Sequence, residues 1–112
     1  MAVTIVSQSN TESVPNLAVL RITTDASAAV NTTFQVGFLP RIVKMVNITD
    51  SIMDEWFDGM AADNAVHTIA AGTRSLLGAG GITVGSTAGG GFVTVAAALI
   101  IASKTFNICV WG

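Results

Sequence analysis

Few residues of this chain could do chemistry, and their spacing argues against catalysis. His67 is the single histidine and Cys109 the single cysteine, so a Ser-His-Asp or Cys-His set would have to use them. No Gly-x-Ser-x-Gly motif is present, and Cys109 lies in an alternating apolar run rather than at an exposed turn or helix start. We therefore expect a non-enzymatic protein with no catalytic residue, in which His67 is a polar side chain near a strand edge and Cys109 a buried, inert thiol.

The densest group of charges is acidic and has the wrong pattern for a metal site. It consists of Asp50, Asp54, Glu55, Asp58 and Asp63. The spacing Asp54-x-x-x-Asp58-Gly59 superficially resembles a calcium loop, but Trp56 and Ala65 would occupy two of the positions that need oxygen ligands. We expect no metal, and a solvated or interface-facing acidic rim in its place.

Glycines gather in the second half of the chain, at positions 78, 80, 81, 85 and 89–91. They match neither the Gly-x-Gly-x-x-Gly pattern of dinucleotide sites nor a phosphate loop, which needs a Lys after the last glycine. They are expected to form flexible turns between strands, and no cofactor is expected.

Composition excludes several functional classes and favours association with other proteins. The chain of 112 residues is 51% hydrophobic but only 11% charged, whereas soluble domains carry roughly 25%. A monomer of this mass exposes about 5,800 Å², or roughly one charge per 480 Å². A surface with so few charges predicts a homo-oligomer, because charge is what keeps the surfaces of soluble domains from associating. The net charge of −2 argues against nucleic acid as a partner.

A membrane partner is not expected either. The longest apolar run, residues 92–102, is about half of the ~20 residues needed to cross a bilayer. Residues 1–9 lack the basic and apolar regions of a signal peptide, so none is expected.

The elements that must position these residues are β-strands, because Val, Ile and Thr make up close to a third of the chain. Strands are predicted at residues 17–23, 34–38, 41–49, 51–57, 82–84, 92–96 and 106–111. Residues 51–57 could instead be helical, although a strand is preferred, and 60–71 hold either a short strand or a loop. Residues 72–81 look irregular, 86–91 are expected to be a flexible loop, and 97–103 a helical turn or a wide corner.

The expected fold class is all-β, a compact sandwich or barrel-like domain of about seven or eight short antiparallel strands. Residues 15–112 form this single domain. Residues 1–14 become polar after Val6 and could be an N-terminal arm that reaches a neighbouring subunit, although a frayed terminus is preferred. In the last strand Phe106, Ile108 and Val110 share one face, while Cys109 and Trp111 share the other.

Two stretches resemble small virion proteins of tailed bacteriophages. Residues 36–50 (VGFLPRIVKMVNITD) followed by 55–60 (EWFDGM) match a strand that leads into a tryptophan strand ending in Gly-Met. The glycine-rich stretch, then GFVTV at 91–95, a small-residue corner and an aromatic closing strand are also similar. The resemblance covers about half of the chain, and the Ala-rich residues 61–71 depart from it. It implies a capsid decoration or cement protein, often a trimer on the major capsid protein, made in the host cytoplasm and located on the virion.

We therefore expect a structural protein of the virion, and two alternatives stay open. The first is another virion part, such as a tail tube, connector or fibre base. The second is a carbohydrate- or receptor-binding β module in which Trp56 and Trp111 would be exposed stacking platforms. Because opposite charges set register between subunits, the interface candidates are the charged and aromatic residues Arg41, Lys44, Asp54, Glu55, Trp56, Asp58 and Trp111.

Overall fold

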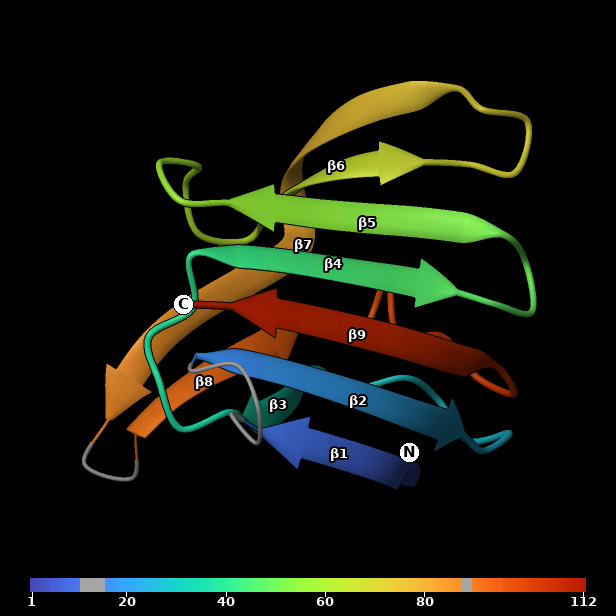
Figure 1. Ribbon diagram of the computed structural model, residues 1–112. Coiled ribbons are helices and arrows are strands. Elements are labelled where there is room, and N and C mark those ends of the chain that lie inside the picture. The colour runs from blue at the N-terminus through green and yellow to red at the C-terminus, as the bar shows by residue number, and fades with distance from the viewer. Residues whose placement is uncertain (11–15, 88–89) are drawn as a thin grey trace.

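The computed structural model describes residues 1–10, 16–87 and 90–112, and these residues form strands and turns without a helix. Nine antiparallel strands make one sheet (Figure 1). They are β1 (Val3–Asn10), β2 (Leu17–Thr24), β3 (Thr32–Gln35), β4 (Ile42–Asn47), β5 (Ile52–Phe57), β6 (Asn64–Thr68), β7 (Arg74–Thr87), β8 (Gly90–Val95) and β9 (Thr105–Trp111). The predicted all-β class is confirmed, with one or two strands more than expected.

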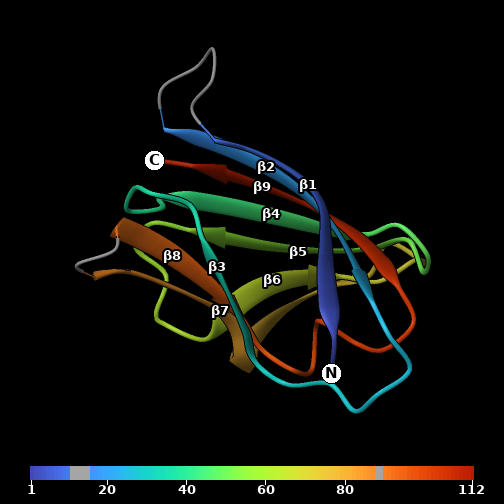
Figure 2. The same ribbon diagram turned by 90° about the horizontal axis from the view of Figure 1, so that it is seen from below.

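The sheet rolls into a nearly closed barrel. Its strand order is β1-β2-β9-β4-β5-β6-β7-β8-β3, so β1 and β3 are the two edges. Seen from below, β2, β9, β4 and β5 form one layer, and β7, β8 and β3 lie beneath it (Figure 2). We call the layer of β2, β9, β4 and β5 the front layer. Where the edges approach, the Gln8 side-chain amide donates to the backbone carbonyl of Gln35 over 2.9 Å. Rolling the sheet brings the two free edges together, which limits pairing with other chains.

The core follows from strict alternation in the central strands. Phe106, Ile108 and Val110 of β9 share one face as predicted and are buried, while Asn107, Cys109 and Trp111 point to the other face. Within the described chain that face is not covered, and Cys109 is half-buried, not buried as expected. β9 lies between β2 and β4, so the last predicted strand occupies the centre of the front layer. Residues 97–103, expected as a helical turn or a wide corner, contain a turn in which the amides of Leu99 and Ile100 donate to the Ala96 carbonyl, and this turn places both side chains in the core.

Residues 72–81 are not irregular, because most of them belong to the long strand β7. The first part of β7 pairs with β6 and the last part with β8, and the register with β6 jumps from Leu77 to Ile82 between them. The glycines at this corner allow two backbones to touch: a Cβ on Gly81 would lie 2.5 Å from the Asn64 backbone. They therefore bend a strand and are not flexible turns. Residues 88–89 of the expected loop at 86–91 lie outside the described residues, and the flanking ones belong to β7 and β8.

The expected N-terminal arm is largely a strand of the barrel. β1 pairs with β2 of the same chain from Val3 to Asn10, with a bulge between Ile5 and Ser7. Residues 3–10 therefore are not frayed, since intramolecular pairing supplies their hydrogen bonds. The expected boundary between residues 14 and 15 lies outside the described residues. Residues 51–57 adopt the preferred strand, β5, and residues 60–71 contain β6.

Candidate interaction surface

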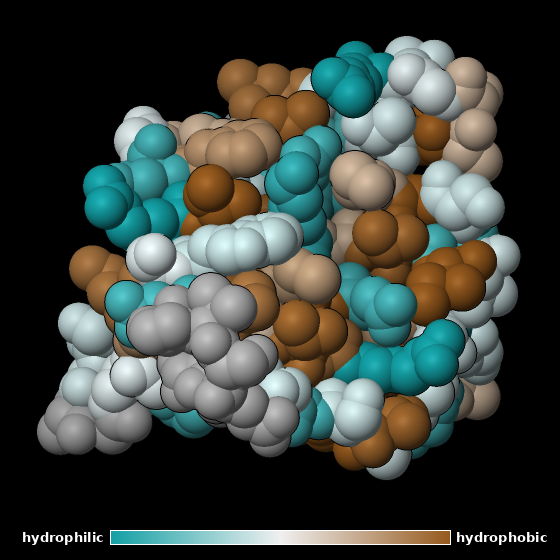
Figure 3. Space-filling model, in the orientation of Figure 1, coloured by the Kyte–Doolittle hydropathy of each residue, from teal (hydrophilic) through white to brown (hydrophobic). Residues whose placement is uncertain are grey.

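The front layer has one face toward the core and one face toward solvent. We call the solvent side the outer face. Its side chains come from alternate positions of adjacent strands: Leu17, Val19 and Arg21 of β2; Asn107, Cys109 and Trp111 of β9; Ile42, Lys44 and Val46 of β4; Met53, Glu55 and Phe57 of β5; and Val66 of β6. Figure 3 shows apolar groups spread over this side of the molecule between polar ones.

Register aligns these residues in rows across the strands. One row runs Trp111, Ile42, Phe57, and the next runs Cys109, Lys44, Glu55, Val66. Directly opposite side chains on one face lie about 5 Å apart, so each row is a continuous contact surface. The outer face is thus mainly apolar, with charges confined to particular positions.

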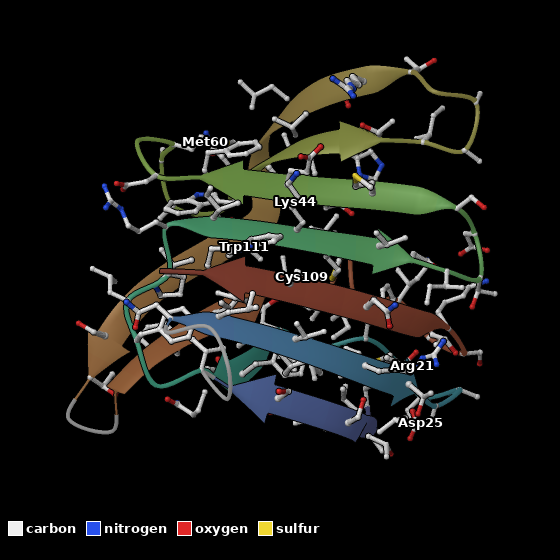
Figure 4. All side chains as sticks on the ribbon, in the orientation of Figure 1. Arg21, Asp25, Lys44, Met60, Cys109 and Trp111 are labelled. Carbon is white, nitrogen blue, oxygen red and sulfur yellow. The ribbon has the colours of Figure 1, made fainter. Side chains whose placement is uncertain are left out.

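The charges in β4 and β5 and next to their ends are sorted by strand. Lys44 of β4 lies 3.8 Å from Glu55 of β5, and Arg41, just before β4, lies 3.5 Å from Asp58, just after β5. Both cations therefore lie in β4 or just before it, and both anions lie in β5 or just after it. Lys44 also lies 6.0 Å from the centre of the Trp111 ring, and Figure 4 shows Lys44, Cys109 and Trp111 grouped on adjacent strands. Exposed pairs of this kind add little stability within one chain, at roughly 0.2–1 kcal/mol each.

A shallow cleft of about 390 Å³ opens beside the Arg41–Asp58 pair, and we call it the Trp111 cleft. Its lining comes from the ends of β4, β5 and β9: Arg41, Ile42, Phe57, Asp58, Trp111 and Gly112. An aromatic wall next to an ion pair offers both an apolar platform and hydrogen-bonding groups.

Two of the seven interface candidates lie inside the barrel instead. Trp56 is 5% exposed, packs in the core and donates from its indole nitrogen to the Ala61 carbonyl. Asp54 is 2% exposed and lies 2.5 Å from Nδ1 of His67. The alternation of side chains along β5 explains both positions: Asp54 and Trp56 point to the core face, and Glu55 between them points to the outer face. The other five candidates, Arg41, Lys44, Glu55, Asp58 and Trp111, lie on or beside the outer face.

The carboxyl group of Asp54 is an acid whose pKa is shifted by its position inside the barrel. Burial raises the pKa of Asp54, and the hydrogen bond and charge of His67 offset this rise only in part. Sequence reasoning missed this pair because the partners are 13 residues apart, and only the pairing of β5 with β6 brings them together. Ser75 is the register partner of His67 on β7, and no side-chain hydrogen bond joins these two described residues.

The expected acidic rim does not exist as a single cluster. Asp50 interacts with Asn47 and with the Lys104 ammonium, at 3.0 Å in each case. Asp63 accepts hydrogen bonds from the backbone amides of Gly80 and Gly81 at the corner of β7. Within the described ranges, no three His, Cys, Asp or Glu side chains are grouped so that they could hold a metal ion.

Comparisons of the chain with protein-family models, with curated proteins and with solved structures found no match. The resemblance to bacteriophage virion proteins therefore stays a prediction. Among the described residues, no helix is long and apolar enough to cross a membrane.

Proposed function

We propose that this protein is a non-enzymatic structural component of a virion, a capsid decoration or cement protein that acts through its outer face. In this proposal it is made in the host cytoplasm, associates with itself and contacts the major capsid protein. The order of three for the self-association comes from the resemblance alone.

The observation that carries the proposal is the gathering of three predicted interface residues, Lys44, Glu55 and Trp111, on one open sheet face, with Arg41 and Asp58 at its edge. That face combines exposed Val19, Met53 and Phe57 with two ion pairs. Protein interfaces have this composition, with an apolar and aromatic centre and few charges. The low charge of the whole chain favours the same role, because a surface that is covered in an assembly needs little charge for solubility.

The test is to find the chain in particles. Virus particles from cultures that produce this sequence would be purified on a density gradient and analysed by mass spectrometry and electron cryomicroscopy. We expect the chain in the particle band in stoichiometric amounts, with density on the shell that fits a nine-stranded barrel of 34 × 29 × 24 Å. Its absence from washed particles would refute the proposal, and density in the tail would favour another virion part.

A second candidate is carbohydrate binding, and the Trp111 cleft favours it. Trp111 and Phe57 supply aromatic surface, and the Arg41–Asp58 pair supplies donors and acceptors at the rim. Aromatic rings cover the apolar faces of sugars, while charged groups bind their hydroxyls. Trp56 cannot take part as an exposed platform, because it is in the core.

Tryptophan fluorescence distinguishes the candidates, because the two tryptophans differ in exposure. In a titration with bacterial-surface glycans, sugar binding would shift the emission of the W56F variant, whose remaining tryptophan is Trp111. The W111F variant would show no shift and provides the control. No response in W56F, with the protein folded, would reject the carbohydrate candidate.

A further inference from the structure

We propose that the outer face is a self-complementary interface for a second copy of this chain, related by a two-fold axis that runs along the strands between β4 and β5. The inference deepens the proposed function, and rests on it only in taking the outer face to be an interface. It names the partner of that face.

The charge pattern has the symmetry that such an axis needs. Arg41 and Lys44 lie on the β4 side of the axis, and Asp58 and Glu55 lie at the paired positions on the β5 side. A two-fold rotation about a line between these strands, in the plane between two stacked sheets, places β4 of one copy over β5 of the other. Each cation then faces an anion, since Lys44 lies over the partner's Glu55 and Arg41 over the partner's Asp58.

The apolar positions match under the same operation. Ile42 pairs with Phe57 and Val46 with Met53 in the register of β4 and β5. After the rotation, Ile42 faces the partner's Phe57 and Val46 faces the partner's Met53. No charge is placed against an apolar side chain at these positions, and no two like charges meet. A two-fold interface requires this self-complementarity, because the same patch serves both copies.

The geometry of stacked sheets and the available area are also adequate. Sheets that pack face to face keep their strands within about 30° of each other, which an axis along the strands allows. A standard interface buries about 800 Å² on each partner. That is about one seventh of the 5615 Å² accessible surface of the chain, roughly the share of one side of the molecule. The charge pattern matches a two-fold axis and shows no three-fold relation, so the expected assembly is a pair and not the trimer implied by the resemblance.

The decisive experiment uses two variants with opposite charge on the outer face. The variant R41E/K44E makes all four of these charges negative, and E55K/D58K makes them all positive. The wild-type chain is expected to have twice the 11.5 kDa chain mass in light scattering and native mass spectrometry at micromolar concentration. Each variant alone is expected to be monomeric, and an equimolar mixture is expected to form a mixed pair, because their four charges are then opposite.

Recovery of the pair when the two variants are mixed depends on contacts between chains, so effects within one chain cannot produce it. Three of the four changed side chains are at least 45% exposed, and circular dichroism and thermal melting check that the variants fold. Met53→Glu tests the apolar part and is expected to give a monomer. Val30→Glu is its matched control, because Val30 is also exposed but lies off the outer face, and it is expected to leave the pair intact.

A monomeric or trimeric wild-type chain, or a mixture that stays monomeric, would overturn the two-fold pair. So would variants that associate as well as the wild type does. None of these outcomes bears on the presence of the chain in particles, which the mass spectrometry of purified virions decides separately.

Discussion

At the scale of single residues, Asp54 has a structural role and not the role of a surface charge. Its carboxylate is buried beside Met45 in the register of β4 and β5, and its hydrogen-bonding partner is the His67 imidazole. A buried acid with one partner favours its neutral form. The pair therefore links the stability of the barrel to pH.

The variant D54N isolates this linkage. The pKa of Asp54 is raised above 3.8 in the folded chain, so its protonated form contributes stability at low pH that is lost as the pH rises through the interval above 3.8. We expect the free energy of unfolding of the wild type, minus that of D54N, to decrease with pH across this interval. Urea unfolding at several pH values measures it. A difference that increases with pH would mean that the ion pair with His67 outweighs burial.

Asp63 provides a second residue-level prediction. Its carboxylate accepts from two backbone amides at the corner of β7, and its own φ is +66°. We expect D63A to lose about 2–4 kcal/mol of stability, since it removes charged hydrogen bonds and leaves a side chain in a left-handed conformation. D63N should lose less, because the amide oxygen still accepts. D63G separates the two causes, because it removes the same hydrogen bonds but leaves no side chain in the left-handed conformation. We expect it to lose less stability than D63A, and a D63G as destabilised as D63A would show that backbone strain contributes little.

At the scale of elements, β9 determines whether the barrel exists. It pairs with β2 on one side and β4 on the other and buries Phe106, Ile108 and Val110. A chain ending at Thr105 would leave β2 and β4 each unpaired on one side and remove these three side chains from the core. We expect it not to fold, because the loss exceeds the ~3–5 kcal/mol of a single large core truncation. A soluble fragment with a cooperative melting transition would contradict this.

β1 is the matched comparison for β9, because it is an edge strand that pairs on one side only. Deleting residues 1–9 removes a strand with exposed Ile5 and Val6 and opens the edge of β2. We expect a folded but less stable barrel that aggregates more readily, as an uncovered edge is a template for pairing. Thermal melting together with light scattering after heating measures both effects. If this deletion is as damaging as the loss of β9, the barrel depends on closure more than on its central strands.

At the scale of the whole molecule, pairing of two copies through the outer face should make the melting temperature Tm depend on protein concentration. If two copies pair through the outer face, the folded pair is favoured by mass action, so Tm rises with protein concentration. We expect this rise for the wild type and Val30→Glu, and a concentration-independent Tm for R41E/K44E. Scanning calorimetry over a hundredfold range of concentration measures it. An unchanged Tm for the wild type would argue against a stable pair.

The sequence by itself determined the fold class and most of the strands of this protein. Apolar and β-branched runs bounded by turn residues placed β2, β4, β5, β8 and β9. Alternation predicted correctly which side chains of β9 share a face, because the two-residue period of a strand is a local property. The same period could have placed Asp54 and Trp56 inside, since they alternate with Glu55, but which face of β5 meets the core depends on its neighbours.

Tertiary structure alone decided the strand order, the bend of β7 and the position of β1. Pairing between residues distant in sequence brings Asp54 to His67 and Gln8 to Gln35, and no local pattern encodes such contacts. It also converts an acidic stretch of the sequence into separate roles: Asp63 holds a corner, Asp54 lies in the core, and Glu55 and Asp58 face the cations of β4. Local sequence sets the conformation of each strand, but only the rolled sheet fixes which side chains share a surface.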